Sequence, residues 1–268
     1  SALCQRLLSK PPEDRYQSCD ALLQALVSLL AGLTDVRGFR PSDGVPGDQA
    51  VVEPTLIMDA GNVAHPVPPP VPDADASSFV GRCKELIDLT ERVETGQRVV
   101  TLHGPGGAGK TRLSRHFGRT KYRMFPGGVW FCDLTQSTTR DSMLDVVGTS
   151  LKVPLLSEDP AVQLGHAIDS RAKALFILDN VEQIIDPVAE VVSIWSQTAP
   201  EAVFLITSRR RLGISGEHVL AVEPLPVREA VELFACYGAQ VSPGFIVTDS
   251  EYDTVRQIVE HLDCIPLG

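Results

Sequence analysis

The sequence lacks an excess of positive charge, and this limits the partners that it can have. Its 24 Lys and Arg residues are outnumbered by 34 Asp and Glu residues, which gives a formal net charge of -10. An acidic chain is poorly suited to broad contact with the phosphate backbone of a nucleic acid. We therefore expect no direct nucleic-acid partner for this segment.

The sequence also lacks an apolar run long enough to cross a membrane, and no signal-peptide pattern stands at its start. Its six cysteines are scattered without a C-x-x-C pair, and its six histidines are equally scattered. These spacings favour free thiols in a reducing compartment over disulfides or a zinc site. We therefore expect a cytoplasmic protein without membrane association.

What the sequence does contain is a complete phosphate-binding loop. An apolar run at 99–102 predicts a buried strand, and the residues from Arg112 onward predict a helix, so the loop stands in the strand–loop–helix context that it requires. Lys110 would bridge the β- and γ-phosphates, and the hydroxyl of Thr111 would ligate Mg²⁺. The expected ligands are ATP or ADP with Mg²⁺. The loop consists of Gly104, Pro105, Gly106, Gly107, Ala108, Gly109, Lys110 and Thr111.

Three zones follow one another along the chain. Residues 1–33 carry leucines at helical spacing and predict a helical segment. Residues 34–77 are rich in Pro and Gly, with a polyproline run near their end, and predict a linker. Residues 78–268 alternate between strand and helix patterns, so they predict a three-layer α/β domain with a parallel central sheet.

The elements of this domain can be placed by their patterns. Continuous apolar runs bounded by turn residues predict strands at 98–103, 128–133, 174–179, 202–207 and 218–222. Amphipathic spacing predicts helices at 82–95, 110–119, 140–152, 160–170, 184–198, 227–239 and 249–262.

Two acids near the end of the third strand complete the expected metal and water site. Asp179 ends an apolar strand, and an acid in that position faces the phosphate loop and can hold Mg²⁺. Glu182 is the next acid, while Asn180 cannot accept a proton, so Glu182 is the candidate general base. It could equally be a solvated acid that a helix N-terminus favours.

A cation follows the fourth strand in the same way. The apolar run 204–206 is followed by two polar residues and then by Arg209, which could read the γ-phosphate. The triplet 209–211 could instead be a solvated charge run, and we assign Arg210 and Arg211 to solvent.

Together these motifs resemble a known family. The stretch F-V-G-R-x-x-E-L at 79–86, the phosphate loop, the L-D-N-x-E strand end and the T-S-R strand end are similar to the STAND-type ATPases. The similarity is closest to the NB-ARC-like modules of large bacterial transcriptional regulators. It implies nucleotide contacts at Val80, Arg82 and Pro266, and a γ-phosphate contact at Arg209. Asn180 stands where many relatives have a second Asp, which implies slow hydrolysis.

A second resemblance concerns residues 7–18, which look like the end of the C-lobe of a Hanks-type Ser/Thr protein kinase. No catalytic kinase motif accompanies them. The resemblance implies a piece of a kinase–ATPase fusion, in which the chain starts inside one domain and stops inside the other.

These observations lead to one functional hypothesis and two alternatives. We expect an ATP- or ADP-binding signalling switch with slow or regulated hydrolysis, which contacts other protein domains or associates with itself on activation. One alternative is a kinase fusion whose nucleotide domain is a non-hydrolysing interaction scaffold. The other is an AAA+-like DNA-remodelling ATPase, against which the acidic charge of the chain argues.

Overall fold

The structure is a computed structural model that describes residues 79–266. Residues 79–239 and 245–266 belong to one compact unit of the chain. The expected helical segment at 1–33, its resemblance to a kinase and the expected linker at 34–77 lie outside the described residues. The predicted module at 78–268 is therefore described except for its terminal residues.

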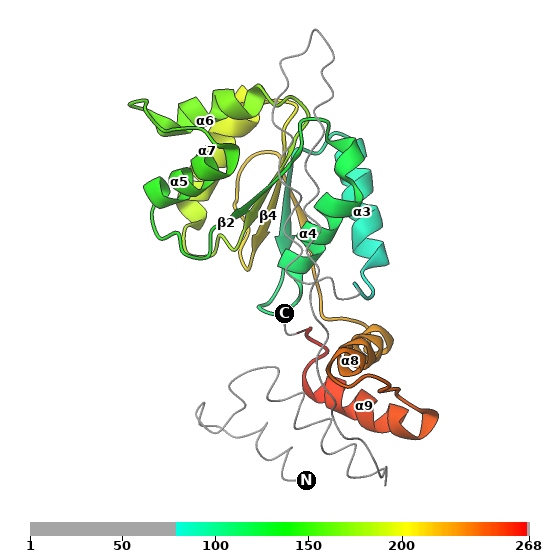
Figure 1. The fold of residues 1–268 in the computed structure, drawn as a ribbon. Helices are drawn as coiled ribbons and strands as arrows, with labels where there is room; N and C mark the ends of the chain where they lie inside the picture. Colours follow the sequence, from blue (N-terminus) through cyan, green and yellow to red (C-terminus); the bar gives the residue numbers. More distant parts are fainter. Residues whose placement is uncertain (1–78, 267–268) are drawn as a thin grey trace, which may run out of the picture. The chain divides into compact units, whose positions relative to one another are not determined.

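The centre of the domain is a parallel sheet of five strands in the order β2-β3-β4-β1-β5 (Figure 1). All of its pairs are parallel. Each connection between parallel neighbours must cross over the sheet, and helices provide these crossovers. The predicted α/β fold with a parallel central sheet is confirmed. The strands are β1 (Val99–His103), β2 (Val129–Asp133), β3 (Leu175–Asp179), β4 (Val203–Ser208) and β5 (Glu217–Ala221).

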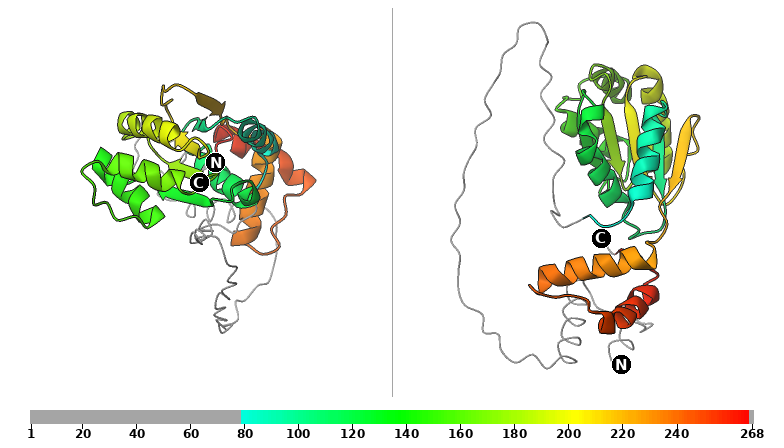
Figure 2. Two further views of the ribbon diagram at one scale, coloured as in Figure 1. Left: turned by 90° about the horizontal axis from the view of Figure 1, so that it is seen from above. Right: turned by 90° about the vertical axis from the view of Figure 1, so that its right-hand side faces the viewer.

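Helices cover both faces of the sheet, and each face has its own core. Phe176 and Leu178 of β3 pack on the face of α5, α6 and α7, whereas Leu175 and Ile177 pack on the face of α3 and α4. Both views of Figure 2 show the sheet between these two layers. The helices are α3 (Cys83–Glu94), α4 (Lys110–Thr120), α5 (Arg140–Leu151), α6 (Pro160–Asp169) and α7 (Ile185–Thr198).

Two further helices follow the last strand. They are α8 (Val227–Val241) and α9 (Asp249–His261), and a separate cluster of buried side chains joins them. Its fully or nearly buried members are Leu225, Ala230, Val231, Val255 and Val259.

The sequence patterns placed every one of these strands and helices within two residues of its bounds. They missed a short 3₁₀ helix at Tyr122–Met124, which leads from α4 toward β2. In the described part of the chain, no helix combines the length and the apolar character that a membrane crossing needs.

Candidate nucleotide-binding site

The phosphate loop connects β1 to α4, and its shape depends on its glycines. Gly107 and Gly109 have φ angles of 76° and 88°, in the left-handed region that other residues rarely adopt. A Cβ on Gly104 would lie 2.3 Å from the backbone oxygen of Val222, so no side chain fits there. Gly109 stands at the N-cap of α4 and supplies no side-chain acceptor to the first turn. The amides of that turn therefore form an anion site.

Lys110 is turned inward over this loop. Its side chain is 8% exposed, and Nζ donates hydrogen bonds of 2.9 Å to the carbonyl oxygens of Gly104 and Pro105. Burial lowers the pKa of Lys110, while the nearby carboxylate of Glu182 opposes this shift. A phosphate group bound on the loop would offer this ammonium a charged acceptor in place of two carbonyls.

Asp179 ends β3 and lies beside the hydroxyl of Thr111. It is 4% exposed, and Thr111 Oγ1 donates to its Oδ1 and Oδ2 at 2.8 and 3.0 Å. Burial raises the pKa of Asp179, and the hydrogen bonds from Thr207 and Thr111 oppose this rise. A carboxylate next to a hydroxyl is an oxygen donor set that suits Mg²⁺.

No group of three or more His, Cys, Asp or Glu side chains is placed to hold a metal ion within residues 79–266. A magnesium site would therefore depend on Asp179, Thr111, water and the phosphates of the nucleotide. This is the usual coordination of Mg²⁺ in phosphate-loop proteins, so these two residues fit the ion.

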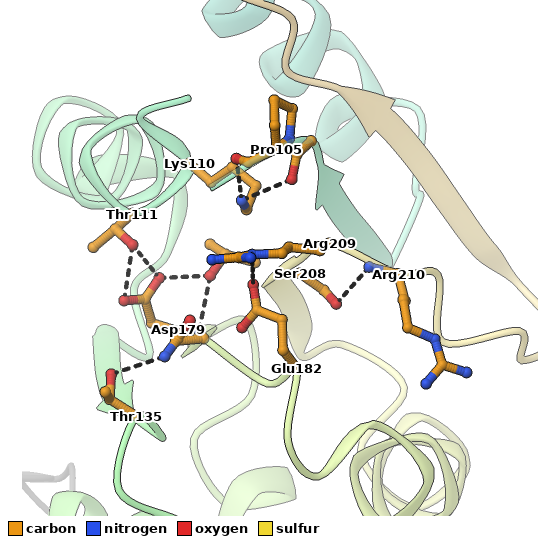
Figure 3. Close-up of polar contacts among 12 residues, drawn as sticks. Pro105, Lys110, Thr111, Thr135, Asp179, Glu182, Ser208, Arg209 and Arg210 are labelled. Atoms are coloured by element: carbon orange, nitrogen blue, oxygen red, sulfur yellow. Dashed lines mark hydrogen bonds and ion pairs between the residues drawn. The ribbon is translucent and has the colours of Figure 1, made fainter. Parts of the chain in front are cut away.

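A guanidinium and an acid complete the site. Arg209 Nε lies 3.8 Å from Glu182 Oε1, and the Arg209 side chain is 66% exposed. A Cβ on Gly106 would lie 2.7 Å from Arg209 Nη2, which places this guanidinium against the phosphate loop. The second oxygen of Glu182 is buried without a hydrogen-bond partner in the part of the chain that the structure describes. Figure 3 shows Lys110, Arg209, Glu182 and Asp179 converging from different elements.

The structure thus brings the expected loop, metal and acid residues together around one point. Arg210 and Arg211 are exposed. Pro266 also lies at the loop, because its Cγ is 3.6 Å from the position of a Cβ on Gly109. Val80 is half-buried near the start of the described chain. Contacts of Val80 and Pro266 with a nucleotide stay predictions.

Arg82 has a position that the sequence did not indicate. It is 5% exposed, its Nη1 lies 2.6 Å from Glu85 Oε1, and its Nη2 donates a 2.9 Å hydrogen bond to the carbonyl of Ala108. Both ends of the guanidinium are thus bonded to protein groups. A direct contact of Arg82 with a nucleotide stays an untested prediction.

Sequence reasoning identified Thr111 but missed two other threonines of the site, Thr207 and Thr135. Thr207 Oγ1 donates to Asp179 Oδ1 at 2.6 Å and accepts from the backbone N–H of Asn180 at 2.9 Å. Asn180 has a φ of 62°, and its side-chain amide donates to Thr135. The signal for Thr207 was present, since it is the first residue of the T-S-R motif and stands two residues before the arginine of that motif.

Asp133 was missed as well. It ends β2 in register with Asp179 of β3, and Thr135 Oγ1 donates to its Oδ1 at 2.5 Å. This hydrogen bond lowers the pKa of Asp133. The rule that singled out Asp179, an acid at the end of an apolar strand, applies equally to Asp133.

The domain combines a parallel sheet in this strand order with a phosphate loop after β1, a buried acid at the end of β3 and a cation after β4. These features together define a class of proteins. The class is that of the P-loop NTPases. Residues 93–212 match the family model described as an AAA domain. This segment is therefore similar to AAA domains, and its fold and site are those of a P-loop ATPase.

The full-length relatives extend the comparison. An uncharacterized protein of Mycobacterium tuberculosis (strain H37Rv) is 34% identical over 197 residues, which cover 72% of this chain and 49% of that protein. A protein of the same strain named "putative HTH-type transcriptional regulator" is 32% identical over 172 residues, which cover 64% of this chain and 19% of that protein. The chain thus spans about half the length of the first of these relatives and a smaller part of the second.

Two solved structures are similar to this chain to different degrees. Cdc6p from Pyrobaculum aerophilum superposes with a TM-score of 0.51 at 14% identity, covering 68% of this chain and 56% of that one. A STAND protein with a tetratricopeptide repeat sensor from Pyrococcus horikoshii gives a TM-score of 0.47 at 18% identity, covering 71% and 30%. At 14% identity the likeness to Cdc6p speaks for the fold alone.

Proposed function

We propose that this domain binds ATP or ADP with Mg²⁺ and acts as a nucleotide-dependent switch with slow hydrolysis. The observation that carries the proposal is the pair formed by Arg209 and Glu182 beside Lys110 and Gly106. A cation and an acid that meet at the mouth of a phosphate loop can respond to the terminal phosphate of a nucleotide.

Each residue has a definite task in this proposal. Lys110 and the loop amides bind the phosphates, and Thr111 with Asp179 holds Mg²⁺, which neutralises phosphate charge when bound. Arg209 exchanges its contact with Glu182 for a contact with the γ-phosphate. Glu182 then loses its cationic partner and orients a water molecule. Binding of the γ-phosphate therefore changes the contact of Arg209 and at the same time releases Glu182, the candidate base.

Slow turnover follows from the residues around the candidate base. Asn180 cannot accept a proton, and its side chain and backbone are bonded to Thr135 and Thr207. Glu182 is the remaining acid, and it can act on water only after Arg209 has exchanged its contact with Glu182 for the γ-phosphate. A site of this kind holds its nucleotide state for long enough to act as a signal.

The larger context of the switch is also part of the proposal. The sequence motifs that resemble STAND-type, NB-ARC-like modules and the match to a protein named as an HTH-type regulator support a role inside a larger regulatory protein. Its partners would be other protein domains or further copies of itself. The kinase-fusion alternative rests on residues 1–33 and stays a prediction, as does the DNA-remodelling alternative.

Nucleotide binding is tested first at Lys110. Lys110→Ala removes a charge-assisted contact that contributes about 1.5–3 kcal/mol, so the affinity for fluorescent ATP should fall roughly tenfold to a hundredfold. Lys84→Ala, at an exposed position of α3, is the matched control and should leave the affinity unchanged. A folded Lys110→Ala protein with the parent affinity would remove the basis of the proposal.

Turnover is tested at Glu182 and Asn180. In a phosphate-release assay Glu182→Gln should lower the rate and leave ATP affinity near that of the parent, because the residue acts on water. Asn180→Asp adds a second acid and should raise the rate. An unchanged rate in Glu182→Gln would show that Glu182 is not the base, and a total lack of turnover in the parent would favour the scaffold alternative.

A further inference from the structure

Gly81 and Arg82 precede α3, and they contact both the phosphate loop and α8. Gly81 and Arg82 have φ angles of 72° and 64°, so two consecutive residues adopt the left-handed conformation. The Arg82 backbone N–H donates to Glu229 Oε2 at 3.4 Å, and a Cβ on Gly81 would collide with the same carboxylate. Left-handed backbone at a residue other than glycine persists only where its surroundings hold it. Glu229 of α8 is one of the groups that hold it.

The guanidinium of Arg82 reaches the loop from outside. Its hydrogen bond to the carbonyl of Ala108 is buried, and Glu85 holds its other end. Ala108 is fully buried and lies between Gly107 and Gly109, both with positive φ angles. Glycines allow many orientations of the peptide between them, so the bond from Arg82 selects one.

This selection has a consequence for phosphate binding. Across a trans peptide bond the C=O and the following N–H point in opposite directions. Because the carbonyl of Ala108 points at Arg82, the N–H of Gly109 must point away from Arg82. Such N–H groups are the donors that a phosphate loop offers to its ligand.

We propose that Arg82 is a positioning residue that presets the phosphate loop, and that Glu229 of α8 holds the backbone from which Arg82 reaches it. This inference rests on the proposed nucleotide function and deepens it. Arg82 acts on the polyphosphate part of the ligand through the loop, and it does not read the base. The loop is thereby coupled to α8.

Hydrogen exchange tests the inference without any nucleotide. Arg82→Gln should speed exchange in the loop peptide 104–111 by about tenfold, because a buried bond from a charged donor corresponds to one or two decades in an opening equilibrium. Arg82→Lys keeps the charge and one donor and should restore part of the protection. Arg92→Gln is the matched control, since Arg92 lies on α3 and pairs with Asp88.

Ligand binding separates a positioning role from a contact with the base. Tripolyphosphate carries no base, so a positioning residue predicts that Arg82→Gln weakens tripolyphosphate and ATP by the same factor, about tenfold. A contact with adenine predicts weaker ATP binding with unchanged tripolyphosphate binding. That second pattern, or unchanged exchange in the loop, overturns the inference.

The contribution of α8 is tested at Glu229. Glu229→Ala should raise exchange in the loop less than Arg82→Gln does, because it acts through the backbone of Arg82. Glu232→Ala, at an exposed position of the same helix, is the control. If the loop peptide exchanges hydrogen equally fast in Glu229→Ala and in the parent, the proposed coupling to α8 is wrong. The proposed nucleotide function is tested separately: it is contradicted if Lys110→Ala binds ATP as tightly as the parent does.

Discussion

At the scale of single residues, Thr207 organises a buried carboxylate and a backbone N–H. It is 1% exposed, donates to the buried carboxylate of Asp179 and accepts from the N–H of Asn180. Thr207→Val keeps the shape and removes both bonds, so the free energy of unfolding should fall by about 1–3 kcal/mol in a urea titration. Thr207→Ser restores the hydroxyl and should recover most of the loss. A Val variant as stable as the parent would show that neither bond contributes.

Cys132 makes a residue-scale prediction about pH. It is fully buried in β2, and burial raises the pKa of its thiol from 9.0 to about 11. The folded state therefore holds the thiol proton more tightly, so the stabilisation is complete below pH 9 and is lost as the pH rises toward 11. Two pKa units correspond to at most about 3 kcal/mol.

The measurement is the free energy of unfolding of the parent and of Cys132→Ala between pH 8 and 11. The stability difference between the two proteins should shrink as the pH rises, because only the parent has this thiol to ionise on unfolding. Cys83→Ala, which removes an exposed thiol, is the control. A stability difference that stays constant with pH contradicts the assignment.

At the scale of helices and strands, the most reliable predictions came from the spacing of apolar residues within a single strand or helix. The apolar runs of β3 and β4 predicted strands that are buried on both faces of the sheet, and every residue of both strands is buried. The positions of Asp179 and Arg209 followed, because the ends of parallel strands share one edge of the sheet.

The sequence did not predict which distant residues would form hydrogen bonds with one another in the folded domain. The F-V-G-R motif singled out Arg82, but its bond to Ala108 spans 26 positions and depends on how α3 packs against the loop. Thr207 and Asp179 likewise meet across 28 positions. Apolar periodicity is local, whereas such pairings are set by packing, and no pattern within one element contains them.

The packing of α4 on the sheet gives a prediction at this scale. Gly118 lies at the contact, and a Cβ there would be 2.8 Å from Val129 and 3.1 Å from Ile177. Gly118→Ala gains about 1 kcal/mol of helix propensity but adds overpacking strain of about 1–3 kcal/mol. We expect net destabilisation by urea unfolding. The same change also displaces α4, which carries Lys110 and Thr111, so ATP affinity should fall too.

Thr149→Ala, at an exposed position of α5, is the matched change without a sheet contact, and it should be neutral or slightly stabilising. A Gly118→Ala protein that is more stable than the parent would mean that α4 moves away from the sheet without cost.

At the scale of the whole molecule, a chain reduced to residues 78–268 retains every side chain of the two described buried clusters on the faces of the sheet. A chain reduced to residues 78–268 should therefore keep its free energy of unfolding to within about 1 kcal/mol, the usual size of a single contact. Urea unfolding and solution size of the two chains decide this. A collapse in stability would show that residues 1–77 complete the core.

Nucleotide and metal should stabilise the whole domain together. A ligand at a hundred times its Kd stabilises the folded state by about 2.7 kcal/mol, so saturating ATP with Mg²⁺ should raise the unfolding midpoint in urea. Removing Mg²⁺ with EDTA should take away part of this gain, because Lys110 and the loop amides still bind the phosphates.

Asp179→Asn should abolish the part of the gain that depends on Mg²⁺ and keep the remainder, since the amide has lost the charge that attracts the ion. Asp145→Asn removes one exposed acid from α5 and should retain both parts. Each gain is measured against the same variant without ligand, so a lower baseline stability of Asp179→Asn does not enter the result. An Asp179→Asn protein that responds fully to Mg²⁺ would place the ion at another group, and Asp133, in register on the adjacent strand, is then the acid to change next.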